Sequence, residues 1–511
     1  MAHPPLSAGC DQAGEPPAAN LPHAATILPH ILRPYCHDFR DQTAAQRAAK
    51  LPGHLRPNCR SWALICYLST GTRLGAHELP RRYGANSEAS PMHTRLGPAL
   101  PRHAEKVVAD ALADTRVVLI NGARQSGKST LVRLVAVGRD TDWRDLDAAL
   151  MRQAAISDPD GFVESADLMV IDEIQRAPEL LLSIKSRVDA DPRPGRYLLT
   201  GSARVLGLRA LPDTLIGRME TIELWPFSQG EIDSAPDGFL DAVFTQGPDL
   251  RHDSGITRAD YAERIVRGGF PEAVARTTDK RRRAFFDSYL GDLIARDVRQ
   301  LSEIERTAEM RALVRLLAAR SGQLLVPAAL GKELGLGVNT VKRYLSLLEE
   351  VYLIKRIPAW SRNLSSRATL TPKVAFVDSG LAANIIGADA RSLHRPGGHL
   401  GPLLEGFVLM ELARQTGWAE TDVTMHHYRT KDQVEVDAVL ENRRGEVVGI
   451  EVKAASTVRA EDFRHLRHLA DRLGDEFVAG IVLHTGPQTL PFGPKMLAVP
   501  VSALWEVPPP E

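Results

Sequence analysis

The chain has 511 residues and a hydrophobic fraction of 44%, and it exceeds the roughly 250–300 residues that one hydrophobic core supports, so we expect more than one domain. With 63 basic and 63 acidic residues its net charge is zero, which gives no global attraction to a polyanion, and aromatic residues at 5% are too few for a platform that stacks single-stranded bases. No run of about 18 apolar residues and no basic-then-apolar leader is present, so we expect a cytoplasmic protein without a membrane span.

Residues 1–98 contain many Pro, Ala, His and Arg residues and show little hydrophobic periodicity. This composition predicts a mostly disordered N-terminal extension. The four cysteines all lie within the first 66 residues and form no C-x-x-C pair, which favours free thiols over a zinc site. Because Met92 stands just before the first organised segment, a further hypothesis is that translation starts there and that residues 1–91 are not translated.

A phosphate-binding loop is predicted between an apolar run at 117–120 and a helical pattern. The intervening sequence places Gly122, Gly127, Lys128 and Ser129 in the pattern G-x-x-x-x-G-K-[ST]. The glycines let successive backbone N–H groups point at a phosphate, and the helix directs the positive end of its dipole at the same anion. An ordinary strand–turn–helix connection is the alternative, but it does not require all four positions to be filled.

The residues of this loop have distinct expected roles. Lys128 should reach the β- and γ-phosphates of the nucleotide, and the Ser129 hydroxyl should bind Mg²⁺. Gln125, Ser126 and Thr130 belong to the same loop and are expected to contact the nucleotide as well.

A second apolar run, 168–171, ends in Asp172 and Glu173. An acidic pair after a strand is common, but one α/β unit after a phosphate loop it is typical of the catalytic half of a nucleotide site. Asp172 is expected to hold Mg²⁺, usually through water, and Glu173 to polarise the attacking water.

A third strand at 197–199 leads into the sequence TGS. Small hydroxyl residues at the carboxyl end of a parallel strand fall in the crevice where such sheets bind ligands, so Thr200 or Ser202 can contact the γ-phosphate. A simple turn is the alternative. Arg204 and Arg218 follow, and either one can stabilise charge on the transferring phosphoryl group.

The nucleotide motifs and several later segments resemble AAA+-type ATPases of bacteria and archaea. The matching segments read GARQSGKST, VIDEIQRAP, LLTGSAR, LIGRMETIELWPFSQGE, RGGFPEA and YLGDLIARDV. More narrowly, they resemble the subfamily whose C-terminal half is catalogued as a domain of unknown function, over residues from about 100 to 455. The resemblance implies an α/β P-loop core over residues 99–235 that binds adenine nucleotide, and no N-K-x-D motif for reading guanine stands near this core.

A linker and a helical lid region are expected over residues 236–305, because 235–260 is rich in Asp, Gly and Pro. Three helical patterns and then a strand pattern follow, at 312–317, 327–334, 340–350 and 352–358. Short helices followed by a strand over residues 306–360 are typical of a winged helix-turn-helix, in which one helix enters the DNA major groove.

The helix expected at 340–350 has one apolar and one basic face. Its apolar stripe falls at i, i+3, i+4 and i+7, on Val341, Tyr344, Leu345 and Leu348. Lys342 and Arg343 point the other way, and Asn339 is placed to cap the helix. A helical packing module with a solvated basic face, which contacts only proteins, is the alternative to a DNA-binding helix.

A third module is expected over residues 361–500, with a tail at 501–511. Its helix, its two strands and the turn between the strands are predicted at 403–415, 434–440, 447–453 and 442–445. The alternation of the second strand puts Glu451 and Lys453 on one face, where Asp437 on the neighbouring strand can meet them.

This arrangement is similar to PD-(D/E)xK nucleases, with Glu405 in the place of the helical acid. The similarity implies that Glu405, Asp437 and Glu451 hold Mg²⁺ and that Lys453 orients or activates water beside the scissile phosphate. Two alternatives stay open: a pair of salt bridges on an exposed sheet face, or a nuclease-like fold that binds without cutting.

The expected protein is a mixed α/β chain with a P-loop core on a parallel sheet, a winged helix-turn-helix and a restriction-endonuclease-like domain. It binds ATP and Mg²⁺, hydrolyses ATP, and couples hydrolysis to the binding or processing of double-stranded DNA; a homo-oligomer is one expected form. The alternative is a nucleotide-controlled switch that binds DNA or a protein partner and cuts nothing. The expected catalytic residues are Lys128, Glu173, Asp437, Glu451 and Lys453.

Overall fold

The computed structural model describes residues 93–94, 97–202, 215–298, 307–363, 367, 370–395 and 397–510. The predicted N-terminal extension, with its cysteines and Met92, lies outside these residues except for a short antiparallel pair, β1 (His93–Thr94) and β2 (Gly97–Pro98). None of the described helices has both the length and the apolar character that crossing a membrane requires.

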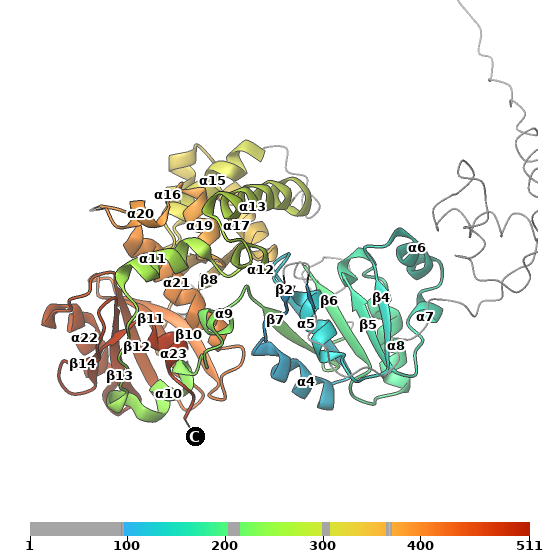
Figure 1. Cartoon of the computed structure of the whole chain (residues 1–511), viewed down its shortest axis with the longest axis horizontal. Helices are drawn as coiled ribbons and strands as arrows, with labels where there is room; N and C mark the ends of the chain where they lie inside the picture. The colour runs from blue at the N-terminus through green and yellow to red at the C-terminus, as the bar shows by residue number, and fades with distance from the viewer. Residues whose placement is uncertain are drawn as a thin grey trace, which may run out of the picture. The chain divides into compact units, whose positions relative to one another are not determined.

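Five parallel strands form the first sheet, in the order β4-β5-β6-β3-β7 (Figure 1). Their bounds are β3 (Val117–Gly122), β4 (Thr141–Asp145), β5 (Leu168–Asp172), β6 (Tyr197–Gly201) and β7 (Met219–Leu224). The three strands predicted in this part of the chain are confirmed. Because β3 lies between β6 and β7 while β4 lies at the far edge, the strand order reverses beside β3, where sheets of this kind bind ligands.

Helices cover both faces of this sheet. They are α4 (Ala104–Asp114), α5 (Lys128–Val135), α6 (Ala149–Ser157), α7 (Pro159–Phe162), the short η3 (Ile174–Arg176) and α8 (Leu180–Ala190). Helices α4 and α5 pack on the face that bears Val118 and Ile120, whereas α6, α7 and α8 pack on the face that bears Val117 and Leu119. The central strands β3, β5 and β6 are therefore buried on both faces, which explains why they read as largely apolar runs.

A helical part follows the first sheet. Its elements are α9 (Gln229–Asp233), α10 (Phe239–Gln246), η5 (Gly247–Asp249), α11 (Arg258–Arg267), α12 (Pro271–Val274), α13 (Asp279–Asp292), the π-helix η6 (Leu293–Val298), α15 (Thr307–Ala319), α16 (Pro327–Leu334), α17 (Val338–Glu350), α19 (Ser379–Ile385) and α20 (Ala390–Leu393). Strands β8 (Ile354–Ile357) and β9 (Lys373–Phe376) pair antiparallel. The helices predicted at 327–334 and 340–350 are confirmed, and the strand predicted at 352–358 is present in shortened form.

Two expectations in this part are wrong. The stretch 235–260 is not a plain linker, because it contains α10, in which Phe239 and Leu240 are fully buried. Its Gly and Pro residues mark turns on either side of a packed helix. Asn339 does not cap α17, because Gly337 is the N-cap and Asn339 lies within the first turn.

A second, mixed sheet has the order β10-β11-β12-β13-β15-β14 (Figure 1). The elements of this part are α21 (Leu400–Gln415), β10 (Val423–Arg429), β11 (Glu435–Asn442), β12 (Val447–Lys453), η7 (Ala460–Phe463), α22 (Arg464–Leu473), η8 (Gly474–Glu476), β13 (Phe477–His484), β14 (Leu490–Pro491), β15 (Met496–Pro500) and α23 (Ala503–Glu506). Helix α21 packs on the face that bears Leu440 and Ile450, and α22 packs on the face that bears Val439 and Val482. The predicted helix, the two predicted strands and the turn between them are present, but β10, which was not predicted, lies between α21 and β11. The turn closes with a 3.0 Å hydrogen bond from Gly445 N to the Asn442 carbonyl.

One hydrophobic cluster continues from the helical part into α21 and the adjoining face of the second sheet. The expected boundaries near residues 305 and 360 therefore do not separate independent cores among the described residues. The tail expected at 501–511 is also part of this core, because α23 buries Leu504 and Trp505 completely.

Candidate functional site

The phosphate loop lies between the end of β3 and the start of α5, as predicted. Gln125 and Gly127 have positive φ values of 60° and 99°, which turns the chain sharply before Lys128. A Cβ atom on Gly122 would lie 2.1 Å from the Leu224 carbonyl oxygen of β7, so only glycine fits at that position. The first glycine of the motif thus serves strand packing, and the second serves the turn.

Lys128 points back into the loop. Its ammonium donates hydrogen bonds to the carbonyl oxygens of Gly122, at 3.0 Å, and Ala123, at 2.9 Å, and the residue is 5% exposed. Ser129 and Thr130 follow in the first turn of α5 and are half-buried. The structure therefore gathers the predicted phosphate ligands around one turn of backbone.

Two buried polar atoms beside this loop have no hydrogen-bond partner among the described residues: Asn121 Oδ1 and Ser126 Oγ. Buried polar groups in folded proteins are almost always paired, so their presence here fits a polar ligand. The phosphates of a nucleotide, with their magnesium ion, are a polar ligand of this kind. Ser129 and Asp172 fit the small set of protein ligands that Mg²⁺ takes when phosphates and water complete its shell.

Asp172 stands at the end of β5 and is held by Thr200 from the neighbouring strand β6. The Thr200 hydroxyl donates to Asp172 Oδ1 and accepts a 3.0 Å hydrogen bond from the backbone N–H of Glu173. Thr200 is fully buried and Asp172 is 7% exposed. Thr200 therefore fixes the orientation of the acidic pair, a role that the sequence did not suggest.

Glu173 adopts a left-handed conformation, with φ of 60°, which is uncommon for a residue with a side chain. Its carboxylate accepts a 3.0 Å hydrogen bond from the Ser202 hydroxyl and another from the Gln175 amide. The Gln175 amide also donates to Ser202 Oγ at 2.8 Å. Backbone strain held in place by a polar network is typical of functional sites. Gln175 was not predicted, although it stands two residues after Glu173.

Arg218 lies away from the phosphate loop of the same chain, so it is not placed to stabilise charge on a phosphoryl group there. The Arg218 carbonyl accepts from the N–H of Val117 at the amino end of β3, and its guanidinium pairs with Asp189 at 2.5 Å. The phosphate loop lies at the opposite end of β3, about 15–20 Å away along a strand of this length. Arg204 lies outside the described residues.

The C-terminal carboxylates surround a lysine that was not predicted. Lys373 on β9 is 1% exposed, and its ammonium lies 2.7 Å from Glu405 Oε1, 2.9 Å from Asp437 Oδ1 and 3.0 Å from Glu435 Oε1. Burial alone lowers the pKa of Lys373, but the charges of Asp437 and Glu405 outweigh it and raise the pKa. The Lys373 ammonium therefore provides a positive charge at the centre of this group of carboxylates.

Glu451 and Lys453 lie on one face of β12, as the alternation predicted. Lys453 Nζ donates to Glu451 Oε2 at 3.2 Å, and Asp437 Oδ2 accepts a 2.9 Å hydrogen bond from the backbone N–H of Val452. Glu451 Oε1 is buried without a hydrogen-bond partner among the described residues, with His465 Nδ1 3.9 Å away. Burial, reinforced by the charge of Asp437, raises the pKa of Glu451 to about 8.

This cluster does not fit the predicted magnesium site. Nowhere in the described part of the chain do three or more His, Cys, Asp or Glu side chains form a group that could hold a metal ion. Asp437 directs one oxygen at the Lys373 ammonium and the other at a backbone N–H. Glu405, Asp437 and Glu451 are thus brought into one region, but Lys373 stands where a cation shared by Glu405 and Asp437 would be.

The pH dependence of stability provides a test of this buried cluster. Burial, reinforced by the charge of Asp437, raises the pKa of Glu405 to about 8, well above its unfolded value of about 4.3. The protonated carboxyl therefore stabilises the fold at low pH, and this contribution is lost as the pH rises toward 8.

Glu405→Gln, which cannot ionise, should stabilise the protein relative to wild type by an amount that grows from about pH 5 to about pH 8. Urea unfolding at four pH values in this window measures the difference. A stability difference that stays constant across the window would show that Glu405 does not titrate there.

Three segments match known protein families. Residues 114–233 match an AAA domain, and residues 258–392 and 400–504 match two domains of unknown function. The match to an AAA domain supports an AAA-type ATPase that binds and hydrolyses ATP. The other two families have no described activity, so the winged helix and the nuclease-like domain stay predictions.

The chain is similar to whole proteins as well. Two uncharacterised proteins, from Mycobacterium bovis and Mycobacterium tuberculosis, are each 29% identical over 464 residues, which cover 88% of this chain and 95% of the relative. A Walker-type ATPase of Pyrococcus abyssi is 15% identical, with a TM-score of 0.37 over 58% of this chain and 99% of that chain. A signal transduction ATPase with numerous domains from Pyrococcus horikoshii is 12% identical, with a TM-score of 0.22 over 65% of this chain and 47% of that chain.

Proposed function

We propose that the chain is an ATP-driven switch, in which magnesium-dependent hydrolysis of ATP at the phosphate loop controls the binding of double-stranded DNA. The observation that carries the hydrolytic role is the support of Asp172 and Glu173 by the Thr200 and Ser202 hydroxyls. A carboxylate held in a strained conformation by neighbouring donors is pre-organised to orient a water molecule.

Each residue of the nucleotide site has a role in this proposal. Magnesium, when bound, neutralises charge on the phosphate oxygens, and Ser129 and Asp172 are the residues that would hold it. Lys128 exchanges its hydrogen bonds with two loop carbonyls for contacts with the β- and γ-phosphates. Glu173 orients the attacking water and accepts its proton.

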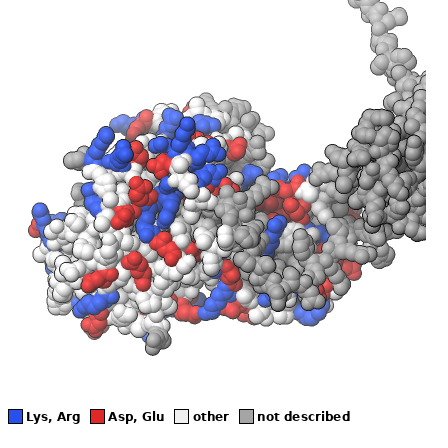
Figure 2. Space-filling model, viewed as in Figure 1, with Lys and Arg blue, Asp and Glu red and all other residues white. Residues whose placement is uncertain are grey.

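DNA binding is proposed for α15, α16, α17 and the β8–β9 pair, whose order suits a winged helix-turn-helix. The basic residues Lys342 and Arg343 on α17 are exposed, while Val341 and Tyr344 on the other side are buried. Figure 2 shows Lys and Arg side chains gathered on the helical part at the top of the view, although the chain as a whole is neutral. A local basic surface of this kind suits the phosphate backbone of DNA.

The salt dependence of DNA binding tests this surface. Replacing both Lys342 and Arg343 by Ala should weaken binding and reduce the slope of log K against log salt by about 0.9 for each DNA phosphate that is no longer neutralised. Arg443→Ala with Arg444→Ala is the matched control, because it removes the same charge from an exposed turn of the second sheet. An unchanged slope in the first variant, or an equal change in both, would place the DNA-binding surface elsewhere.

We propose that the C-terminal site does not cleave DNA, because the Lys373 ammonium lies among the carboxylates that a nuclease would use to bind metal. The alternative is that these carboxylates cut DNA. The deciding experiment incubates the full chain with linear, supercoiled and branched duplexes in Mg²⁺ or Mn²⁺, with and without ATP. We expect ATP-dependent retention of DNA and no cuts. Cuts that disappear in Asp437→Asn would establish the nuclease instead.

A further inference from the structure

Arg102 lies just before α4 and contacts the phosphate loop from outside. Its guanidinium donates three hydrogen bonds: to the Ser126 carbonyl at 2.9 Å, to the Trp225 carbonyl at 2.7 Å and to Glu231 Oε1 at 2.9 Å. It also stacks on the ring of Phe227, 4.5 Å from the ring centroid. With 8% of its surface exposed, this arginine is part of the interior.

The contact with Ser126 matters because of where that residue stands. Ser126 lies between Gln125 and Gly127, the two loop residues with positive φ. A loop of this kind binds an anion when its N–H groups converge and its carbonyl groups point away. Because Arg102 binds the Ser126 carbonyl, that oxygen cannot turn toward the phosphates and repel them.

Arg102 is in turn held by the segment 225–231, which follows β7. Glu231 and Ser228 form a capping box at the start of α9. The backbone N–H of Ser228 therefore holds the Glu231 carboxylate that pairs with Arg102. Both partners of the Arg102–Glu231 pair are almost completely buried. Removing one partner of such a pair leaves the other charge uncompensated.

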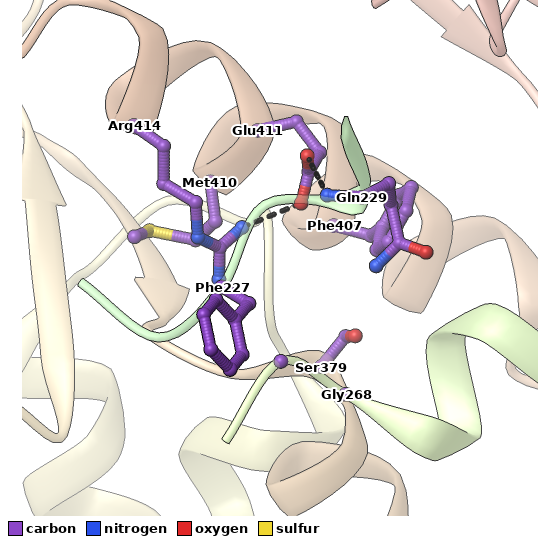
Figure 3. Close-up of a pocket in the computed structure, with 9 residues that line it drawn as sticks. Phe227, Gln229, Gly268, Ser379, Phe407, Met410, Glu411 and Arg414 are labelled. Atoms are coloured by element: carbon purple, nitrogen blue, oxygen red, sulfur yellow. Dashed lines mark hydrogen bonds and ion pairs between the residues drawn. The ribbon is translucent and has the colours of Figure 1, made fainter. Parts of the chain in front are cut away.

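The segment 225–231 also forms hydrogen bonds with α21 (Figure 3). The backbone N–H of Gln229 donates to Glu411 Oε2 at 3.0 Å, and Arg414 Nε donates to the Pro226 carbonyl at 3.0 Å. Glu411 and Arg414 pair with each other at 2.7 Å. A continuous set of contacts thus runs from the phosphate loop through Arg102 and the segment 225–231 to α21, the helix that carries Glu405.

We propose that Arg102 is a positioning residue for ATP, which sets the phosphate loop in its binding conformation and ties it through the segment 225–231 to α21. This proposal rests on the proposed function of the nucleotide site. Arg102 does not contact the nucleotide in this proposal. Its effect is exerted through the Ser126 carbonyl.

The test compares Arg102→Lys with wild type in the full chain. Lysine keeps the charge but cannot reach three acceptors in three directions, so it should not rescue the function. We expect the dissociation constant for Mg²⁺-ATP and the KM to rise by about tenfold or more. Arg367→Lys is the matched control, because Arg367 also forms an ion pair, with the partly buried Glu441, and stacks on Trp360 far along the chain; its nucleotide affinity should equal that of wild type.

Two further readouts separate positioning from simple loss of folding. Destabilisation alone would lower kcat in proportion to the unfolded fraction and leave the KM unchanged, a result that would overturn the proposal. Glu411→Ala, which removes the acceptor of the Gln229 N–H, should raise the dissociation constant for Mg²⁺-ATP by a smaller factor than Arg102→Lys; wild-type affinity in this variant would overturn the link to α21. A wild type that binds ATP without hydrolysing it would refute the proposed ATPase while leaving the Arg102 effect measurable. A wild type that binds no ATP would overturn both.

Discussion

Lys128→Ala should abolish ATP turnover and remove most of the affinity for nucleotide. The Lys128 ammonium is buried within the loop and is the main counter-charge available to the β- and γ-phosphates there. Without it, the phosphates must enter a desolvated site whose strongest favourable charge is missing. Calorimetric titration with Mg²⁺-ATP and a phosphate-release assay measure the two effects.

Lys332→Ala, at an exposed position on α16, is the control for removal of a lysine. It should bind and hydrolyse ATP as wild type does. If Lys128→Ala retained wild-type affinity and turnover, the loop from Gly122 to Ser129 would not be the nucleotide site.

Glu173→Gln should separate binding from hydrolysis. Glutamine keeps the size of the side chain and can still contact Ser202 and Gln175, so ATP should bind with near wild-type affinity. Hydrolysis should fall by about two orders of magnitude or more, because the group that orients water and accepts its proton is removed. Parallel measurements of the dissociation constant and the steady-state rate test this.

Glu179→Gln removes an exposed carboxylate six residues further along the chain and should change neither quantity. A wild-type rate of hydrolysis in Glu173→Gln would assign the water-orienting role to another group.

The parts of the fold that follow from local patterns were predictable from the sequence. The phosphate loop needs only a strand, its glycines and a helix in immediate succession, and β3 and α5 flank it as expected. The alternation of one strand predicts that Glu451 and Lys453 lie on a common face. The hydrogen bond between their side chains agrees with this prediction. The match of residues 114–233 to an AAA domain agrees with the predicted nucleotide motifs, which are short and contiguous.

Residues that act over long separations were missed. Lys373 is brought to Glu405 and Asp437 by the packing of β9 against α21, across 32 and 64 positions of sequence. Arg102 meets Glu231 across 129 positions. Neither lysine nor arginine carries a local signal that it will be buried, because such side chains are usually exposed and only a particular set of carboxylates makes burial favourable.

Composition also led to wrong predictions for segments that contain a short, buried helix. The stretch 235–260 reads as a linker because of its Gly and Pro residues, yet the eight residues of α10 bury an apolar face in the shared core. Trp505 near the C-terminus is another case, since its neighbours suggest a tail while its ring is fully buried. A few large apolar residues decide burial more strongly than the overall composition of a segment.

The identity of the retained nucleotide tests the proposed hydrolytic site most directly. Wild type, Glu173→Gln and Lys128→Ala are incubated with Mg²⁺-ATP, freed of unbound nucleotide and denatured, and the released nucleotide is identified by chromatography. We predict ADP from wild type, ATP from Glu173→Gln and no nucleotide from Lys128→Ala. Unchanged ATP from wild type, or the same nucleotide from all three proteins, would contradict hydrolysis by Glu173 at this phosphate loop.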